Sequence, residues 1–235
     1  MLIQGNFRLL AKSTAIDYNI TPCFMAKPFQ DQAGNSGHIH VSLTDETGKN
    51  LFAAEKRNTQ SYWPDLENFS EIGYHFLAGI LDALPDIMPL LAPTINSYKR
   101  FVESFWAPVL LTWGLEDRMA SIRLIAPPTC KASATRMEIR IPGADMHPHY
   151  ALAAILSAGL RGIQKKLEIT IPPNSARSPK DGPPMRLPKT LQEAVDRFTA
   201  PSSVARELLS DEVVDFFAAT REHELRLWRE AVTDW

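Results

Sequence analysis

The stretch ATRMEIRIP, residues 134–142, constrains the fold because charged and apolar side chains alternate along it. Successive side chains of a β-strand point to opposite faces, so the apolar set would face a core. The charged set would share the other face, namely Arg136, Glu138 and Arg140. A carboxylate between two guanidiniums is strongly biased to its ionised form. The pattern therefore predicts a strand whose outer face is either an ion-pair ladder on the surface or a binding site.

The order of the elements predicts an α+β fold, with an antiparallel or mixed sheet flanked by helices. Apolar alternation or β-branched residues indicate strands at residues 20–29, 38–43, 120–125 and 135–142. The first two of these would pair antiparallel across the polar loop QDQAGNSG. Helical spacing of apolar residues indicates helices at residues 66–91, 148–168 and 213–232. Because strands and helices do not alternate regularly, a doubly wound parallel sheet is not expected.

Composition narrows the classes of partner. The 235 residues are 45% hydrophobic, and 25 basic against 27 acidic residues give a net charge of -2 without a long block of one sign. Nothing here favours a nucleic acid or an anionic membrane as partner. Cys23 and Cys130 are too few for a disulfide framework, and no signal peptide or membrane span is recognisable. We expect a cytoplasmic protein that acts on small molecules.

Several charged residues could form one site if their segments converge. His38 and His40 share a strand face directly after a loop rich in Gly, Asn and Ser. Three further arginines lie in other segments, namely Arg100, Arg118 and Arg123. Taken singly, the two histidines are explained equally well by exposed polar positions of a strand, and each arginine is explained better by a solvated or ion-paired side chain than by a ligand contact. Together they would form a cationic cluster that an anion such as a polyphosphate or a carboxylate would stabilise, with a divalent ion as a bridge.

The sequence resembles the catalytic domain of the glutamine synthetase family. The matching motifs occur in the order of the family and cover nearly the whole chain: FMAKPF, GNSGHIHVSL, NSYKRF, ASIRL, RMEIRIP, HPHYALAAILSAGLRGI and AVTDW. The family joins glutamate to ammonia with ATP, through a γ-glutamyl phosphate made at a site for divalent metal ions between the subunits of a ring. The resemblance thus implies ATP as a substrate and Mg²⁺ or Mn²⁺ as cofactor.

The resemblance also implies roles for individual residues. His38 and Glu138 resemble ligands of the metal that bridges the ATP phosphates. The residues that would lie beside the nucleotide are Ser42, Arg123 and Arg136. Arg118 would act with Arg123 on the phosphates and the transferred phosphoryl group.

The substrate side of the expected site follows from the same resemblance. Arg100 and Arg140 resemble the residues that bind the substrate carboxylates, and Asn35 with Gly37 belongs to the glutamate-binding loop.

The first departure from the family concerns what precedes this sequence. Family members begin with a small β-rich domain, followed by a Glu-x-Glu strand and two further glutamates that hold another metal, and none of these is in residues 1–235. We expect residues 1–235 to be part of a catalytic domain, inactive or very weak alone and a homo-oligomer in its full-length form. The alternative is a non-catalytic relative that serves in assembly or regulation.

The second departure is chemical and concerns Trp106. Glutamine synthetases carry a glutamate just before the Ala-Pro of this segment, where it helps to bind and deprotonate ammonium. The sequence FVESFWAP places Trp106 there, and an indole cannot accept that proton. Family members that ligate larger amines are similar in carrying an aromatic residue here. We therefore expect an organic amine to be preferred over ammonia, unless Trp106 is core packing beside Phe105 and Glu103 takes the role.

Overall fold

The computed structural model describes residues 2–103 and 106–232, which form a four-stranded mixed sheet with helices around it. The strands are β1 (Ile39–Val41), β2 (Trp113–Leu115), β3 (Ile122–Ile125) and β4 (Arg136–Ile139). Their order in the sheet is β1-β4-β3-β2, with β4 antiparallel to β1 and β3, and β2 parallel to β3. The predicted α+β class and mixed sheet are confirmed.

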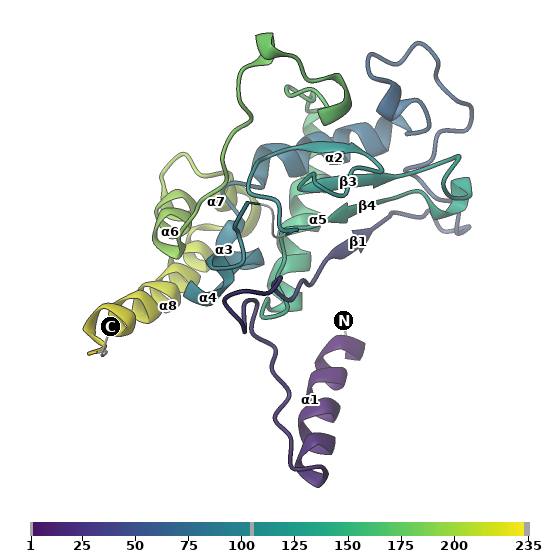
Figure 1. Ribbon diagram of the computed structural model, residues 1–235. Coiled ribbons are helices and arrows are strands. Elements are labelled where there is room, and N and C mark those ends of the chain that lie inside the picture. Colours follow the sequence, from purple (N-terminus) through teal and green to yellow (C-terminus); the bar gives the residue numbers. More distant parts are fainter. Residues whose placement is uncertain (1, 104–105, 233–235) are drawn as a thin grey trace.

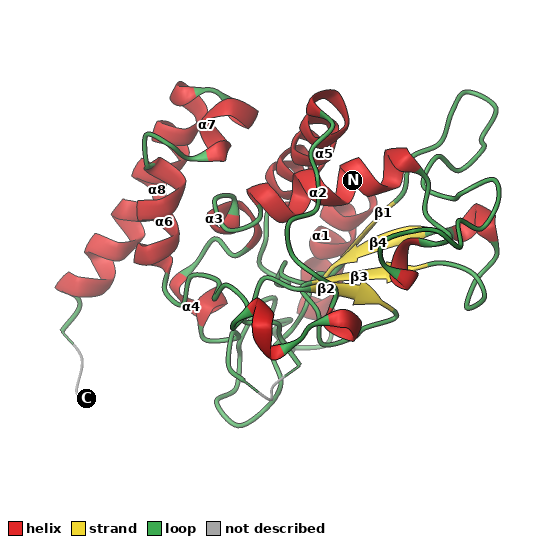
Figure 2. Cartoon of the chain, turned by 90° about the horizontal axis from the view of Figure 1, so that it is seen from above, coloured by secondary structure: helices red, strands yellow, loops and turns green. Residues whose placement is uncertain are grey.

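Helices cover one side of the sheet, and further helices lie beside it (Figures 1 and 2). The longer ones are α1 (Leu2–Asp17), α2 (Glu71–Ala83), α5 (Pro148–Lys165), α6 (Leu191–Thr199) and α8 (Asp211–Glu230). The shorter ones are α3 (Met88–Leu91), α4 (Ile95–Tyr98), α7 (Val204–Leu209) and the 3-10 turns η1 (Pro64–Leu66), η2 (Ala132–Ala134), η3 (Asn174–Ala176) and η4 (Pro179–Asp181). Within the described ranges, no helix combines the length and the hydropathy that crossing a membrane requires.

The alternation in β4 divides the sheet into two faces as predicted. Met137 and Ile139 are fully buried, and so is Ile141 just beyond the strand. They join a core with the apolar faces of α2 and α5, including Phe76 and Ile80. The charged residues of β4 consequently lie on the opposite face of the sheet, away from these helices.

Glycines allow α2 and α5 to pack closely. A Cβ on Gly79 of α2 would lie 2.2 Å from the carbonyl oxygen of Ala158, and a Cβ on Gly162 of α5 would lie 2.1 Å from that of His75. The Phe76 ring occupies the space beside Gly159 in the same way. Small residues at these positions therefore set the distance between the two helices.

Two predicted elements are wrong, and one helix was not predicted. Residues 20–29 form an irregular extended segment rather than a strand, and the predicted pairing partner of β1 is replaced by β4. The predicted helix at residues 66–91 is divided into α2 and α3, because the chain turns at Pro85 and restarts with Pro89 in the first turn of α3. The N-terminal helix α1 was not predicted; it projects from the body (Figure 1) and contacts it through Arg8 and Phe7.

We expect Gly79→Ala and Gly162→Ala to lower the free energy of unfolding by about 1 to 3 kcal/mol, because a methyl group would meet backbone atoms of the facing helix. The measurement is urea denaturation followed by circular dichroism. Gly5→Ala is the control, since a Cβ on this helical glycine meets no atom within 4 Å. That substitution should leave stability unchanged or raise it by up to about 1 kcal/mol. Equal effects at all three positions would contradict this account of the interface.

Candidate functional site

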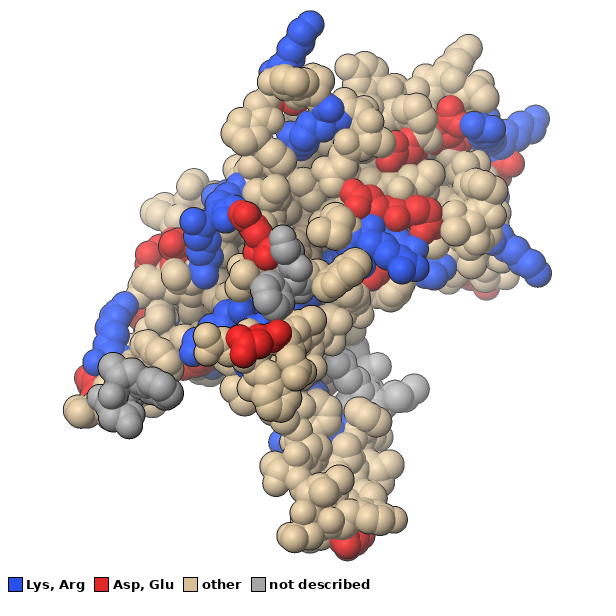
Figure 3. All heavy atoms as spheres, in the orientation of Figure 1, with Lys and Arg blue, Asp and Glu red and all other residues tan. Residues whose placement is uncertain are grey.

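Glu138 lies at the centre of the charged face of the sheet. Its cross-strand partners are His40 on β1 and Arg123 on β3, so three polar residues of adjacent strands meet on one face. Figure 3 shows acidic and basic side chains next to one another over this part of the molecule. The sheet therefore brings together segments that are separated by about a hundred residues in the sequence.

The Glu138 carboxylate is shared by three partners. Arg123 Nη1 donates to Glu138 Oε2 at 3.0 Å, and Arg140 Nη1 donates to Glu138 Oε1 at 3.1 Å. His38 Nδ1 lies 2.8 Å from Glu138 Oε1. The residue is only 4% exposed. We refer below to Glu138, Arg123, Arg140 and His38 as the Glu138 cluster.

Charge and burial oppose each other in the Glu138 cluster. Burial alone would raise the pKa of Glu138, but the Arg140 charge and the Arg123 hydrogen bond outweigh it and hold that pKa below its ordinary value. Burial lowers the pKa of His38 to about 4, and the Arg140 guanidinium adds to the shift against the effect of Glu138. At neutral pH the cluster thus combines an ionised carboxylate with a neutral imidazole.

Arg123 is also paired with a carboxylate that the sequence analysis did not identify. Its Nη2 and Nε donate to Glu116 Oε2, which lies just after β2 in a backbone conformation with φ of 55°. Glu116 reaches Arg123 because β2 and β3 are parallel neighbours. Only six residues connect the short strands β2 and β3, and their parallel pairing leaves no signal in the pattern of apolar residues. Sequence reasoning therefore could not have found this contact.

Arg100 lies behind the cluster rather than in it. The side chain is 3% exposed, and its two terminal nitrogens donate to the carbonyl oxygens of Ile141 at 2.7 Å and of Arg140 at 3.0 Å. Burial lowers the pKa of Arg100 to about 10, which leaves the guanidinium charged at neutral pH. Arg100 therefore fixes the chain at the end of β4, beside the Arg140 side chain.

The loop before His38 is held against the segment that follows β4. Asn35 Nδ2 donates to the carbonyl oxygen of Met25, and the backbone N–H of Gly37 donates to that of Pro142 at 2.8 Å. A Cβ on Gly37 would lie 2.5 Å from the carbonyl oxygen of Gly143. Only glycine permits this approach, which holds Asn35 and Gly37 against the segment that follows Arg140.

The remaining sequence candidates lie around the cluster. Arg136 Nε donates to His40 Nδ1 at 3.1 Å at the edge of the charged face. Ser42, which follows β1, and Arg118, in the turn between β2 and β3, are both exposed. The structure thus pairs Arg123 and Arg140 with Glu138 directly, while Arg100 and Arg136 contact neighbouring groups and Arg118 lies outside this set of contacts.

Trp106 is not a core residue. Its side chain is 65% exposed, and its φ of 64° is unusual for a residue other than glycine. The alternative that Trp106 packs in the core is therefore wrong, whereas Phe105 lies outside the described residues. The exposed indole is free to face a ligand or another part of the protein.

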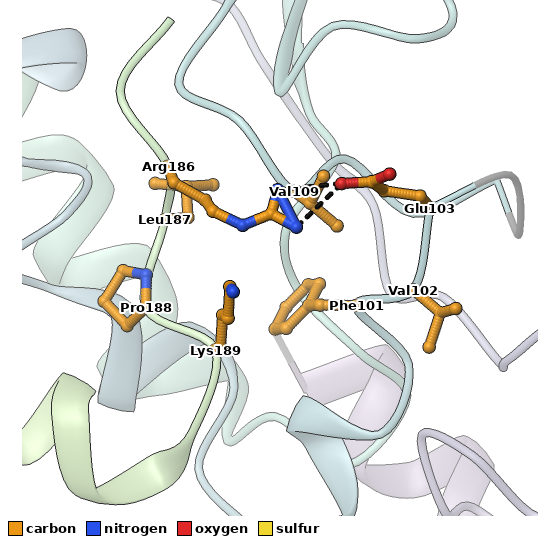
Figure 4. A pocket seen from close by; sticks show the side chains of 8 residues that line it. All are labelled: Phe101, Val102, Glu103, Val109, Arg186, Leu187, Pro188 and Lys189. Carbon is orange, nitrogen blue, oxygen red and sulfur yellow. Dashed lines mark hydrogen bonds and ion pairs between the residues drawn. The ribbon is translucent and has the colours of Figure 1, made fainter.

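Glu103 is already paired in this structure. Its Oε1 accepts hydrogen bonds from Arg186 Nη1 at 2.8 Å and Nη2 at 2.7 Å across a pocket of about 380 Å³. Figure 4 shows the two side chains turned toward each other, with Val109 beside their hydrogen bonds and Phe101 below them. A glutamate engaged in this way is poorly placed to replace the glutamate that Trp106 displaces.

The Glu138 cluster fits part of a site for a divalent metal. His38 Nε2 is buried and has no hydrogen-bond partner in the described part of the chain, while the Glu138 carboxylate is ionised. A neutral imidazole nitrogen and a carboxylate are both donors for Mg²⁺ or Mn²⁺. No group of three or more His, Cys, Asp or Glu side chains with metal-ligand geometry occurs among the described residues.

Comparison with known proteins identifies the family. Residues 4–235 match the family described as glutamine synthetase, catalytic domain. The chain belongs to the glutamine synthetase family. A solved structure described as "GmaS/ADP complex-Conformation 1" superimposes with a TM-score of 0.79 at 26% identity, over 99% of this chain and 52% of that chain. The family resemblance and the catalytic-domain fold are confirmed.

Similar curated proteins include both synthetases and amine ligases. The chain is 40% identical to type-1 glutamine synthetase 2 of Dictyostelium discoideum over 97% of its length and 42% of that protein. It is 36% identical to γ-glutamylethanolamide synthetase GlnA4 of Streptomyces coelicolor, covering 96% of this chain and 45% of that protein. It is 35% identical to glutamate–isopropylamine ligase of a Pseudomonas species, covering 95% and 46%. The chain thus spans less than half the length of these relatives.

We expect Glu138→Gln to lower the free energy of unfolding by about 3 to 5 kcal/mol, because it leaves the buried Arg140 without its anionic partner and removes one of the two carboxylates paired with Arg123. Chemical denaturation measures the change. Glu55→Gln is the control, since Glu55 forms an exposed ion pair with Lys49 and its loss should have no measurable effect. If Glu138→Gln were as stable as the unchanged protein, the cluster would not be a stabilising network.

Proposed function

We propose that this chain forms the metal and phosphate side of an ATP-dependent carboxylate–amine ligase whose substrate is glutamate. The observation that carries the proposal is the Glu138 cluster, in which a buried carboxylate and a neutral histidine lie among arginines on one face of a sheet. Phosphoryl transfer requires this set, since it is catalysed mainly by positioning and by charge neutralisation. Membership of the glutamine synthetase family supports it.

The proposed reaction has two steps. An oxygen of the glutamate γ-carboxylate attacks the γ-phosphorus of ATP, and ADP leaves. The amine then attacks the carbonyl carbon of the γ-glutamyl phosphate, and inorganic phosphate leaves while the amine loses a proton. Both steps move negative charge onto phosphate oxygens, which the guanidiniums of Arg123 and Arg118 would stabilise.

Individual residues take the following roles in this proposal. Arg140 and the loop that carries Asn35 and Gly37 bind the glutamate carboxylates, while Arg100 contributes by fixing the main chain beneath Arg140. Ser42 and Arg136 lie on the nucleotide side, at the end of β1 and the start of β4. These assignments place the two substrates on opposite sides of Glu138.

His38 and Glu138 would hold the divalent ion, whose bound charge offsets that of the phosphate oxygens. Mg²⁺ is commonly bound through one or two carboxylates, with substrate phosphates and water completing its octahedral shell. The buried Nε2 of His38 is available for this role, since its Nδ1 is occupied by Glu138. Hydrogen bonds from Arg123 and Arg140 keep the carboxylate in place.

The proposed amine acceptor is an organic amine rather than ammonia. Trp106 stands where synthetases have a glutamate, and its exposed indole offers an apolar wall to an alkyl group. Two similar proteins support this choice by their names: one is a γ-glutamylethanolamide synthetase and the other a glutamate–isopropylamine ligase.

The test is ADP release by the full-length protein in the presence of Mg²⁺, ATP, glutamate and an amine. We expect release that requires glutamate and metal, and a loss of at least about 100-fold in kcat for Arg123→Gln, because removal of a group that stabilises the transferred phosphoryl costs about 3 kcal/mol. Lys180→Gln, which changes an exposed residue of η4, is the control. ATP hydrolysis independent of glutamate, or an unaffected Arg123→Gln enzyme, would contradict the proposal.

We expect Trp106→Glu to shift the preference toward ammonia. A carboxylate at this position can bind ammonium and accept its proton, whereas the indole cannot. The measurement is the ratio of kcat/KM for ammonia to that for isopropylamine, which should rise about tenfold or more. Trp106→Phe is the matched control, because it keeps an aromatic side chain and should leave the ratio nearly unchanged. An equal ratio in all three proteins would refute the assignment of specificity to Trp106.

A further inference from the structure

Helices α4, α6 and α8 lie close together near the C-terminal end of α8 (Figures 1 and 2), and residues of all three line a second pocket away from the Glu138 cluster. It encloses about 280 Å³. Its apolar wall is formed by Ile95, Leu225 and the ring of Trp228, which is 57% exposed. A large aromatic ring exposed at the rim of an apolar pocket suits a ligand with a flat apolar body.

The charged residues that line this pocket are both basic, although Glu193, Asp196 and Glu224 bond to lining residues from outside it. Lys99 and Lys189 both line it, and none of its described lining residues is Asp or Glu. Lys99 Nζ lies 5.0 Å from the centroid of the Trp228 ring, which holds the ammonium at the pocket edge. Arg229 donates a hydrogen bond to Gln192 Oε1, another lining residue. The nearby Glu193 is turned to the backbone N–H of Lys189 at 2.8 Å.

The pocket also contains one buried polar group that lacks a partner among the described residues. Tyr98 lines it, is 6% exposed, and its hydroxyl has no hydrogen-bond partner in the described part of the chain. Burial raises the pKa of Tyr98 well above its ordinary value, so this hydroxyl is a donor at neutral pH. The N-terminus of α6 opens into the same pocket at Thr190 and Leu191, and helix N-termini favour negative charge.

This pocket is distinct from the candidate active site. Tyr98, Lys99 and Arg100 are consecutive, but Arg100 turns toward the carbonyl oxygens of Arg140 and Ile141 while Lys99 lies over Trp228. The two sites are therefore on opposite sides of the same short segment. None of the residues of the Glu138 cluster lines this pocket.

We propose that the pocket between α4, α6 and α8 binds a small aromatic carboxylate. The aromatic body would lie against Trp228, Ile95 and Leu225, and the carboxylate would accept hydrogen bonds from Lys99 and Lys189 at the N-terminus of α6. The small volume of the pocket favours a compact ligand, and the exposed indole of Trp228 favours an aromatic one. Because two lysines line the pocket and none of its described lining residues is acidic, the ligand should be an anion.

The test is titration of the full chain with benzoate, followed by NMR of the indole N–H of Trp228, whose signal is identified by its loss in Trp228→Phe. We expect a saturable shift with a Kd of about 1 mM or below, which is typical of a small ligand with few contacts. Benzamide, a neutral ligand of the same shape, should bind at least about tenfold more weakly, since it cannot pair with the lysines.

Two variants keep the proposal open to refutation. The double substitution Lys99→Gln with Lys189→Gln should weaken benzoate about tenfold, whereas Lys180→Gln, outside the pocket, should leave its Kd unchanged. Lys99 and Lys189 are both exposed, so the double variant should keep its fold, which circular dichroism checks. Absence of a saturable shift, equal affinity for benzamide, or an unaffected double variant would each overturn the proposal.

Discussion

The candidate site depends on a single buried carboxylate. Glu138 could not remain ionised at 4% exposure without compensation, because desolvation of a carboxylate costs several kcal/mol. Arg123, Arg140 and His38 provide that compensation from three segments of the chain. The alternation of β4 puts Glu138 on the face opposite the core, and the antiparallel neighbours β1 and β3 bring its partners to it. Fold and site are thus determined by the same strand.

A second layer of contacts fixes the geometry of the cluster. Asp145 Oδ2 accepts hydrogen bonds from Thr94 at 2.8 Å and from Ser97 at 2.6 Å, which joins α4 to the segment after β4. Asn96 exchanges hydrogen bonds with the backbone of Lys27, in the extended segment that precedes the glycine loop. The short helix α4 therefore connects the elements that carry His38 and Arg140. These hydrogen bonds join segments that are distant in the sequence, so they orient the site without forming part of it.

Features that follow from a strong periodicity of side chains could be predicted from the sequence. Features that depend on which strands pair with each other could not. The faces of β4 follow from alternation alone, and the motif order identified the family before any geometry was known. Residues 20–29 have an apolar content typical of a strand, yet no partner strand is available to them in the described ranges, so they stay irregular. Glu116 was missed because its contact with Arg123 requires the parallel pairing of β2 and β3. The exposure of Trp106 likewise depends on tertiary context.

The most direct test of the central claim is Mn²⁺ binding in the presence of ADP, measured by electron paramagnetic resonance. We compare the unchanged protein with His38→Gln, which removes the imidazole but retains the ion pairs of Glu138 with Arg123 and Arg140. If the charged face of β4 is a metal and polyphosphate site, the unchanged protein binds Mn²⁺ with ADP and the variant binds it about tenfold or more weakly. Equal Mn²⁺ affinity in both folded proteins would contradict the account.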